Sequence, residues 1–409
     1  MLTWKMAGKL MGNHKGIYLF VFVQQTLSFF VYIIVFSVFF YFADDYLRFR
    51  EYFNRQGVYL QVGQIYDESG QYEIRDSSQL EEMFPGVEII GGYRLNGNFQ
   101  TNEDSVTISA FSYDEEIQSR LKPEMKDGLW LDENTQTDSD SIRGVITDSI
   151  YDVQVGDEIL LRGWMGDWEP ITVEVVGVMK HFSDFWGYSI TDDLQLDFRS
   201  CWEHASFQEP VLFLDKEEIS QKLKENPDSG IGMSLYNSVL ATYKEEADEE
   251  EILSFLEYLK NHGQYGIMEN LSVVNDNSRS YLRQQMLQLF PAALVTLIFS
   301  VVSGVGIKVI LLGLNERRWR IFRLCGCTGR QWAQIQTSAY FIADGAALLF
   351  SLGLIGGAGA LLRTDFSFVV LHWSAAVFCL LVLLFDVLVS WGIIRRMVNN
   401  GENEEGAQE

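Results

Sequence analysis

Three charged residues lie inside stretches of this sequence that are otherwise apolar, and they are its clearest candidates for chemistry. Lys308, Asp344 and Asp386 each fall in a run long enough to be a membrane helix. At 1.5 Å of rise per residue, each lies about 9–14 Å from the same end of the expected spans. A charge at the bilayer centre costs about 2.5–3.5 kcal/mol on insertion scales.

The matching depths predict an intramembrane charge cluster. Lys308 would pair with Asp386 or with Asp344, and the second acid would be protonated or hydrogen-bonded. The alternative is that Lys308 reaches the lipid headgroups and that each aspartate faces water near a loop.

Other residue types with catalytic or ligand-binding chemistry form no recognisable set. The nucleotide-binding pattern G-x-x-x-x-G-K-[ST] is absent, because Gly8-Lys9 lacks both the upstream glycine and the hydroxyl residue. Cys201 and His204 are close in sequence, but two candidate ligands fall short of a metal site. No nucleophile and base stand at a readable spacing. We therefore expect a non-catalytic protein without a cofactor or a bound metal.

Four apolar runs position the three charges, and each is long enough to cross a bilayer, which takes about 20 helical residues. The expected spans are 16–43, 287–314, 335–362 and 372–394. Basic residues occur in the amphipathic segment 1–15, in the stretch 315–334 and at the start of the acidic tail 395–409. Because Lys and Arg concentrate on the cytoplasmic side, we expect a multi-pass protein of the cell membrane with both termini in the cytosol.

The cytosolic stretch 315–334 is both basic and amphipathic at helical spacing. It contains five arginines, and Trp319 and Phe322 fall on one helical face. One interpretation is contact with anionic membrane lipids. The other is a lever on which a cytosolic partner pushes. The residues expected to couple to that partner are Trp319, Ile321, Phe322, Arg323, Leu324 and Gly326.

Residues 44–286 form the one long polar segment, and we expect a mixed α/β domain outside the cell. They hold 48 of the 56 Asp and Glu residues but only 19 of the 31 Lys and Arg residues. So acidic a domain is unsuited to bind nucleic acid through phosphates. It suits an extracytoplasmic surface or a cationic ligand. Cys201 is its single cysteine, so it cannot close an internal disulfide.

Alternating and helical apolar patterns predict the elements of this domain. Strands are expected at 58–66, 87–95, 105–111, 142–147, 158–161, 171–178, 211–214 and 266–274. Helices are expected at 77–82, 114–121, 216–224 and 249–262, and another from Ser278 into the second span. The first two strands and the helix between them read as a β-α-β unit. Gly156 and Gly177 indicate a turn and a close strand contact in a small barrel-like sheet.

Several of these stretches resemble one family of membrane proteins. The run Arg323-Leu324-Cys325-Gly326-Cys327-Thr328, just after a membrane helix, is similar to the intracellular loop of FtsX/MacB-type (type VII) ABC transporter permeases. Pro85-Gly86-Val87 resembles the entry to the MacB-type periplasmic core domain. The segments 144–149, 155–159 and 172–178 follow that family's order and spacing.

The resemblance implies a permease subunit that couples a separate cytosolic ATPase to motion of the outer domain. Its expected partners are an ABC ATPase dimer, a second permease copy or sister permease, and membrane lipids. Its expected role is export or handling of a peptide, an antibiotic or a lipoprotein, and Phe322→Asp is expected to abolish ATPase stimulation. Two alternatives are a non-transporting regulator of a cell-wall hydrolase and a peptide sensor or immunity protein.

Overall fold

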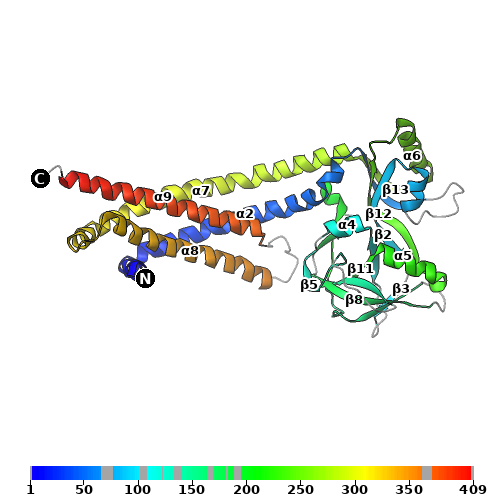
Figure 1. Ribbon diagram of the computed structural model, residues 1–409, viewed down its shortest axis with the longest axis horizontal. Helices are drawn as coiled ribbons and strands as arrows, with labels where there is room; N and C mark the ends of the chain where they lie inside the picture. The colour runs from blue at the N-terminus through cyan, green and yellow to red at the C-terminus, as the bar shows by residue number, and fades with distance from the viewer. Residues whose placement is uncertain are drawn as a thin grey trace. The chain divides into compact units, whose positions relative to one another are not determined.

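The computed structural model describes residues 2–65, 77–96, 98–101, 108–121, 123–132, 141–163, 169–180, 183–187, 195–361 and 371–406 (Figure 1). The chain divides into two compact units. One is a helical unit that comprises Met1–Ala43 with Leu282–Glu409, and the other is a mixed α/β unit that comprises Asp44–Tyr281.

The helices of the first unit follow the apolar pattern of the sequence. They are α1 (Leu2–Asn13), α2 (Lys15–Phe53), α7 (Leu271–Leu324), α8 (Gly329–Leu361) and α9 (Trp373–Gly406). Within the described chain, α2, α7, α8 and α9 are the four helices long and apolar enough to cross a membrane, as the sequence predicts. Both α2 and α7 extend past their apolar runs into residues of the α/β unit.

Polar side chains on α2 and α7 join these two helices inside the apolar unit. Gln25 Oε1 accepts a hydrogen bond from Ser300 at 3.0 Å, and Gln24 Oε1 accepts one from Ser303 at 2.8 Å. In hydrocarbon such groups have no water to bond, so they pair across helices. Buried side chains from all four long helices, among them Ile33, Ala347 and Cys379, form an apolar core.

The stretch 315–334, predicted as a cytosolic loop with a helical face, is helical over most of its length. Helix α7 continues to Leu324 and α8 begins at Gly329, which leaves only four residues between them. The tail 395–409, predicted as an acidic segment outside the spans, begins within α9, which extends to Gly406.

The α/β unit is built on one mixed sheet (Figure 1). The strands are β1 (Gly57–Ile65), β2 (Val87–Asn96), β3 (Asn98–Thr101), β4 (Ser109–Tyr113), β5 (Met125–Gly128), β6 (Ile142–Thr147), β7 (Glu158–Arg162), β8 (Ile171–Met179), β11 (Val211–Asp215), β12 (Gly232–Tyr243) and β13 (Gly263–Asn270). Their order is β13-β1-β12-β2-β4-β11-β6-β8-β7-β3, and β5 pairs with β8. Strands β9 (Asp184–Trp186) and β10 (Trp202–His204) form a separate pair.

Two predictions about the sheet need correction. Strand β12 lies between β1 and β2 and is antiparallel to both, so the predicted β-α-β unit has a third strand inserted in it. Among the described strands, β13 and β3 end the path without pairing with each other, so the sheet is open rather than barrel-like. The strand predicted at 105–111 falls partly on residues 102–107, which lie outside the described residues; β4 begins at Ser109.

The remaining helices cover the sheet at the predicted places. They are α3 (Ser77–Met83), α4 (Glu115–Arg120), α5 (Lys216–Glu225) and α6 (Glu249–His262), together with the 3-10 turns η1 (Phe198–Cys201) and η2 (Pro227–Ser229). The strand predicted at 266–274 is wrong beyond Asn270, because α7 starts at Leu271. Buried Leu271, Val274 and Ser278 recur at helical spacing there, which favours a helix over a strand.

Candidate functional site

The charged residues predicted inside the membrane spans are brought together from three helices. The Lys308 ammonium on α7 donates to both carboxylate oxygens of Asp386 on α9, at 2.7 Å and 2.9 Å. Asp344 on α8 lies one turn after Tyr340 and close enough to interact electrostatically with Asp386 and Lys308. Lys308 and Asp344 are each 2% exposed. The structure thus pairs Lys308 with Asp386 and places Asp344 as the second acid; what the cluster does stays a prediction.

Two neighbours shape the space around the Lys308 ammonium. Gly304 lies one turn before it on α7, and a Cβ there would stand 3.7 Å from Nζ and 3.9 Å from Asp386 Oδ1. The Tyr340 ring centroid on α8 lies 5.5 Å from Nζ. The ammonium therefore meets a carboxylate and an aromatic ring, and both offset the loss of hydration that burial imposes.

The motif from Arg323 to Thr328 forms the turn after α7, and its glycine caps the C-terminus of that helix. Gly326 adopts φ +86°, the left-handed conformation that favours glycine. Its N–H bonds to the carbonyl of Arg323 at 2.9 Å, and the N–H of Cys327 bonds to the carbonyl of Phe322 at 3.0 Å. These two bonds are the Schellman motif, in which a glycine ends a helix and satisfies its last carbonyls. Gly326 therefore stops α7 at a defined residue.

The hydroxyl residue of the same turn starts the next helix. Thr328 Oγ1 accepts the N–H of Gln331 at 3.3 Å, and Gln331 Oε1 accepts the N–H of Thr328 at 3.0 Å. This reciprocal pair is a capping box, which satisfies free donors at a helix N-terminus. The turn that joins α7 to α8 is thus short and specified at both ends.

The predicted coupling residues divide into two groups. Trp319 and Phe322 pack against Trp332 of α8, with ring centroids 5.8 Å and 5.5 Å apart. Ile321 and Leu324 face away and are 56% and 89% exposed, and Arg323 and Gly326 are also exposed. The aromatic pair therefore braces the α7–α8 turn, and the apolar side chains open to a partner are Ile321 and Leu324.

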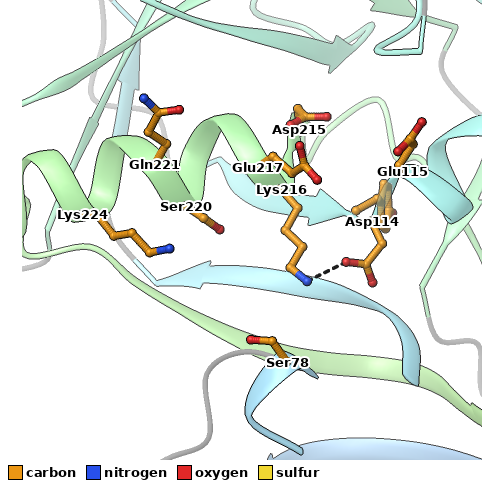
Figure 2. A pocket seen from close by; sticks show the side chains of 10 residues that line it. Ser78, Asp114, Glu115, Asp215, Lys216, Glu217, Ser220, Gln221 and Lys224 are labelled. Carbon is orange, nitrogen blue, oxygen red and sulfur yellow. Dashed lines mark ion pairs between the residues drawn. The ribbon is translucent and has the colours of Figure 1, made fainter. Parts of the chain in front are cut away.

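A polar hollow of about 440 Å³ lies on the α/β unit beside the start of α5 (Figure 2). Lys216 reaches across it to Asp114, with the ammonium 2.7 Å from the carboxylate, and also donates to the Tyr93 hydroxyl at 2.9 Å. Burial lowers the pKa of Lys216, but Tyr93 and Asp114 outweigh it and hold that pKa above its ordinary value. Lys216 is thus a fixed cation that braces α5 against the sheet.

The short motif around Cys201 and His204 serves the fold. The Cys201 side chain is fully buried in η1, and His204 pairs with Asp184 across the strands β10 and β9. The Asp184 carboxylate accepts a hydrogen bond from the imidazole and raises the pKa of His204. Among the described residues, no group of three or more His, Cys, Asp or Glu side chains is arranged to hold a metal ion.

Sequence reasoning named Asp344 on α8 but missed two buried residues of the same helix, Gln336 and Tyr340. Gln336, Tyr340 and Asp344 recur every fourth residue, so they share one helical face, and all three are buried. Each carries polar atoms that have no hydrogen-bond partner among the described residues. The spacing is visible in the sequence, but a glutamine and a tyrosine at the start of an apolar run give no sign by themselves of being buried.

Comparisons with known proteins give structural similarities only. No protein-family model and no curated protein sequence matches this chain. The extracellular domain of the noncanonic ABC-type transporter YknZ from Gram-positive bacteria is similar at 12% identity and a TM-score of 0.26, over 52% of this chain and 98% of that one. The periplasmic region of MacB from Actinobacillus actinomycetemcomitans is similar at 12% identity and a TM-score of 0.28, over 56% and 94%.

Proposed function

We propose that this chain is the permease subunit of an ABC transporter of the FtsX/MacB type. It is a non-catalytic membrane subunit that couples a separate cytosolic ATPase to motion of its extracytoplasmic domain. The observation that carries the proposal is the exposed apolar end of α7 at Ile321 and Leu324, set among arginines and braced from behind by Trp332. Large exposed apolar side chains on a fixed turn suit a groove on a partner protein.

Helix α7 connects the proposed ATPase-docking turn to the α/β unit. It is one helix of 54 residues, whose first turns belong to the α/β unit and whose last turn carries Leu324. A push at its last turn is transmitted along the helix axis, because each turn is hydrogen-bonded to the next. Pro291 lies inside it and removes one such bond, which weakens the hydrogen-bond ladder at that turn.

The proposal includes partners on both sides of the membrane. Two copies of the ATPase would bind a pair of permeases, formed by two copies of this chain or by this chain and a sister permease. Membrane lipids would contact the basic residues near the inner face. The cargo would be a peptide, an antibiotic or a lipoprotein, for export or for handling outside the membrane.

We expect Ile321→Asp and Leu324→Asp to release the ATPase. Both side chains are exposed, so the substitutions place a charge in the docking surface and leave the packing of α7 intact. Full-length chains would be cross-linked in native membranes and purified, and the co-purifying P-loop protein would be measured by its ATP hydrolysis. Phe322→Asp is less informative than the sequence implied, because Phe322 packs on Trp332 and its loss disturbs the turn itself.

Ile150→Asp is the matched control, since Ile150 of the α/β unit is as exposed as Ile321, at 56%. It should retain the wild-type yield of ATPase. If Ile321→Asp, Leu324→Asp and Ile150→Asp all retain the same yield of ATPase, the α7–α8 turn contacts only lipid and the proposal is wrong.

The proposed orientation has both termini in the cytosol and the α/β unit outside. Cys325 is exposed beside the α7–α8 turn, whereas Cys201 and Cys379 are buried. We therefore expect a membrane-impermeant maleimide to leave the native chain unlabelled in intact cells and to label Cys325 after permeabilisation. The variant Asp228→Cys, at an exposed position in η2, should be labelled in intact cells. The reverse pattern would invert the topology.

A further inference from the structure

The charged cluster in the helical unit contains two acids, Asp344 and Asp386, but only one cation, Lys308. Lys308 forms a bidentate ion pair with Asp386, so its charge is already matched. Asp344 is as buried as Lys308, yet neither of its carboxyl oxygens has a hydrogen-bond partner among the described residues. A buried carboxylate without a donor or a counter-ion is strongly disfavoured, and such a group binds a proton instead.

The groups that face Asp344 offer a place for that proton. The Asp386 carboxyl on α9 and the Lys308 ammonium on α7 are bound to each other, and both lie near enough to interact electrostatically with Asp344. Tyr340 lies one turn away on α8 itself, and its ring is 5.9 Å from that of Tyr18 on α2. Neither tyrosine is charged at neutral pH. Among these groups, only Asp386 is an anion that accepts a hydrogen bond from a protonated Asp344.

We propose that Asp344 is a proton-binding site and that the protonated Asp344 carboxyl donates a hydrogen bond to Asp386. The proton reaches Asp344 from the Gly329 end of α8, along a hydrated line of side chains. No covalent bond other than O–H forms or breaks: a proton from water adds to one Asp344 oxygen. With the proton bound, Lys308, Asp386 and Asp344 together are neutral. Without it, the same three groups carry one net negative charge.

The access line consists of Gln336 and Tyr340. They precede Asp344 by two turns and one turn on the same face of α8, so they lead from the start of the helix towards the cluster at about 6 Å per step. Both are fully buried, and both Gln336 amide atoms and the Tyr340 hydroxyl have no partner among the described residues. Buried polar groups of this kind are commonly satisfied by ordered water, and water beside them would carry protons.

Infrared spectroscopy of the full chain in lipid nanodiscs tests the site by counting protonated carboxyl groups near neutral pH. The wild type should show the carbonyl band of one buried protonated acid. Asp344→Asn should lose that band, since Lys308 and Asp386 then neutralise each other. Asp386→Asn should lose it too, because Lys308 is left with one acid to pair with. Lys308→Met should enlarge it, because two acids then share no cation.

Asp276→Asn, at an exposed position in the α/β unit, is the control and should keep the band. The Asn variants at 344 and 386 each keep one lysine and one acid, so charge balance favours their folding even if Lys308→Met fails to fold. A wild-type spectrum identical to that of Asp344→Asn would overturn the proton site. So would a band that persists in Asp386→Asn at full amplitude.

The access line has a separate test in the same samples. After transfer into D₂O, the shift of the acid band reports how fast the Asp344 proton exchanges. Gln336→Leu should slow this shift several-fold, whereas Thr337→Val, which removes a buried hydroxyl on the neighbouring face, should leave it unchanged. Equal rates in the wild type and Gln336→Leu would contradict entry along this face of α8.

Discussion

Replacement of Lys308 by methionine should destabilise the helical unit by about 3–5 kcal/mol at neutral pH, the usual loss when one partner of a buried ion pair is removed. The side chain is 2% exposed, and its ammonium group donates to both oxygens of Asp386. Methionine has nearly the same length and fills the same space, so the loss reports charge rather than a cavity. Thermal unfolding of the full chain in detergent micelles would measure it.

The double variant Lys308→Met with Asp386→Asn supplies the control. Replacing a whole buried pair by neutral groups of similar size is close to neutral, because no uncompensated carboxylate remains at that position. The double variant should therefore recover most of the stability lost by Lys308→Met, and the cycle gives the coupling between the two residues. Identical losses in the single and the double variant would show that the pair contributes nothing beyond packing.

Gly177→Ala should destabilise the α/β unit by about 3 kcal/mol, at the upper end of the range for overpacked positions. Gly177 is a β8 residue between β6 and β5. A Cβ there would lie 2.2 Å from the carbonyl oxygen of Leu129 and 2.6 Å from Met125 Cε. A backbone oxygen cannot turn aside as a flexible side chain can, so the strands would have to separate. Limited proteolysis of the full chain would measure the loss.

Gly232→Ala in β12 is the matched control, because it is also a glycine at a strand position. Its added Cβ would meet nothing closer than 3.9 Å, and the backbone conformation suits alanine. Such replacements usually stabilise a protein by about 0.4–1 kcal/mol through the unfolded chain. If Gly177→Ala and Gly232→Ala resist protease equally, the close strand contact at Gly177 is not what requires glycine there.

Local patterns in the sequence determined most of the helices and strands of this protein. Apolar runs specify the four helices of the described chain that are long and apolar enough to cross a membrane. Alternation or helical spacing specifies most elements of the α/β unit, because these features depend on neighbours within a few residues. The motif from Arg323 to Thr328, which the sequence marked only by its resemblance to a family loop, also acts locally. The glycine and the hydroxyl residue act on the backbone beside them, as a Schellman stop and a capping box.

Tertiary structure decided which of these residues meet. Depth along each run placed Lys308, Asp344 and Asp386 at one level, but helix rotation and packing selected Asp386 as the ion-pair partner. Packing on Trp332 likewise turned Phe322 inwards and left Leu324 exposed. The insertion of β12 between β1 and β2 joins strands far apart in the chain. Such choices depend on contacts across long sequence separations, where local periodicity carries no information.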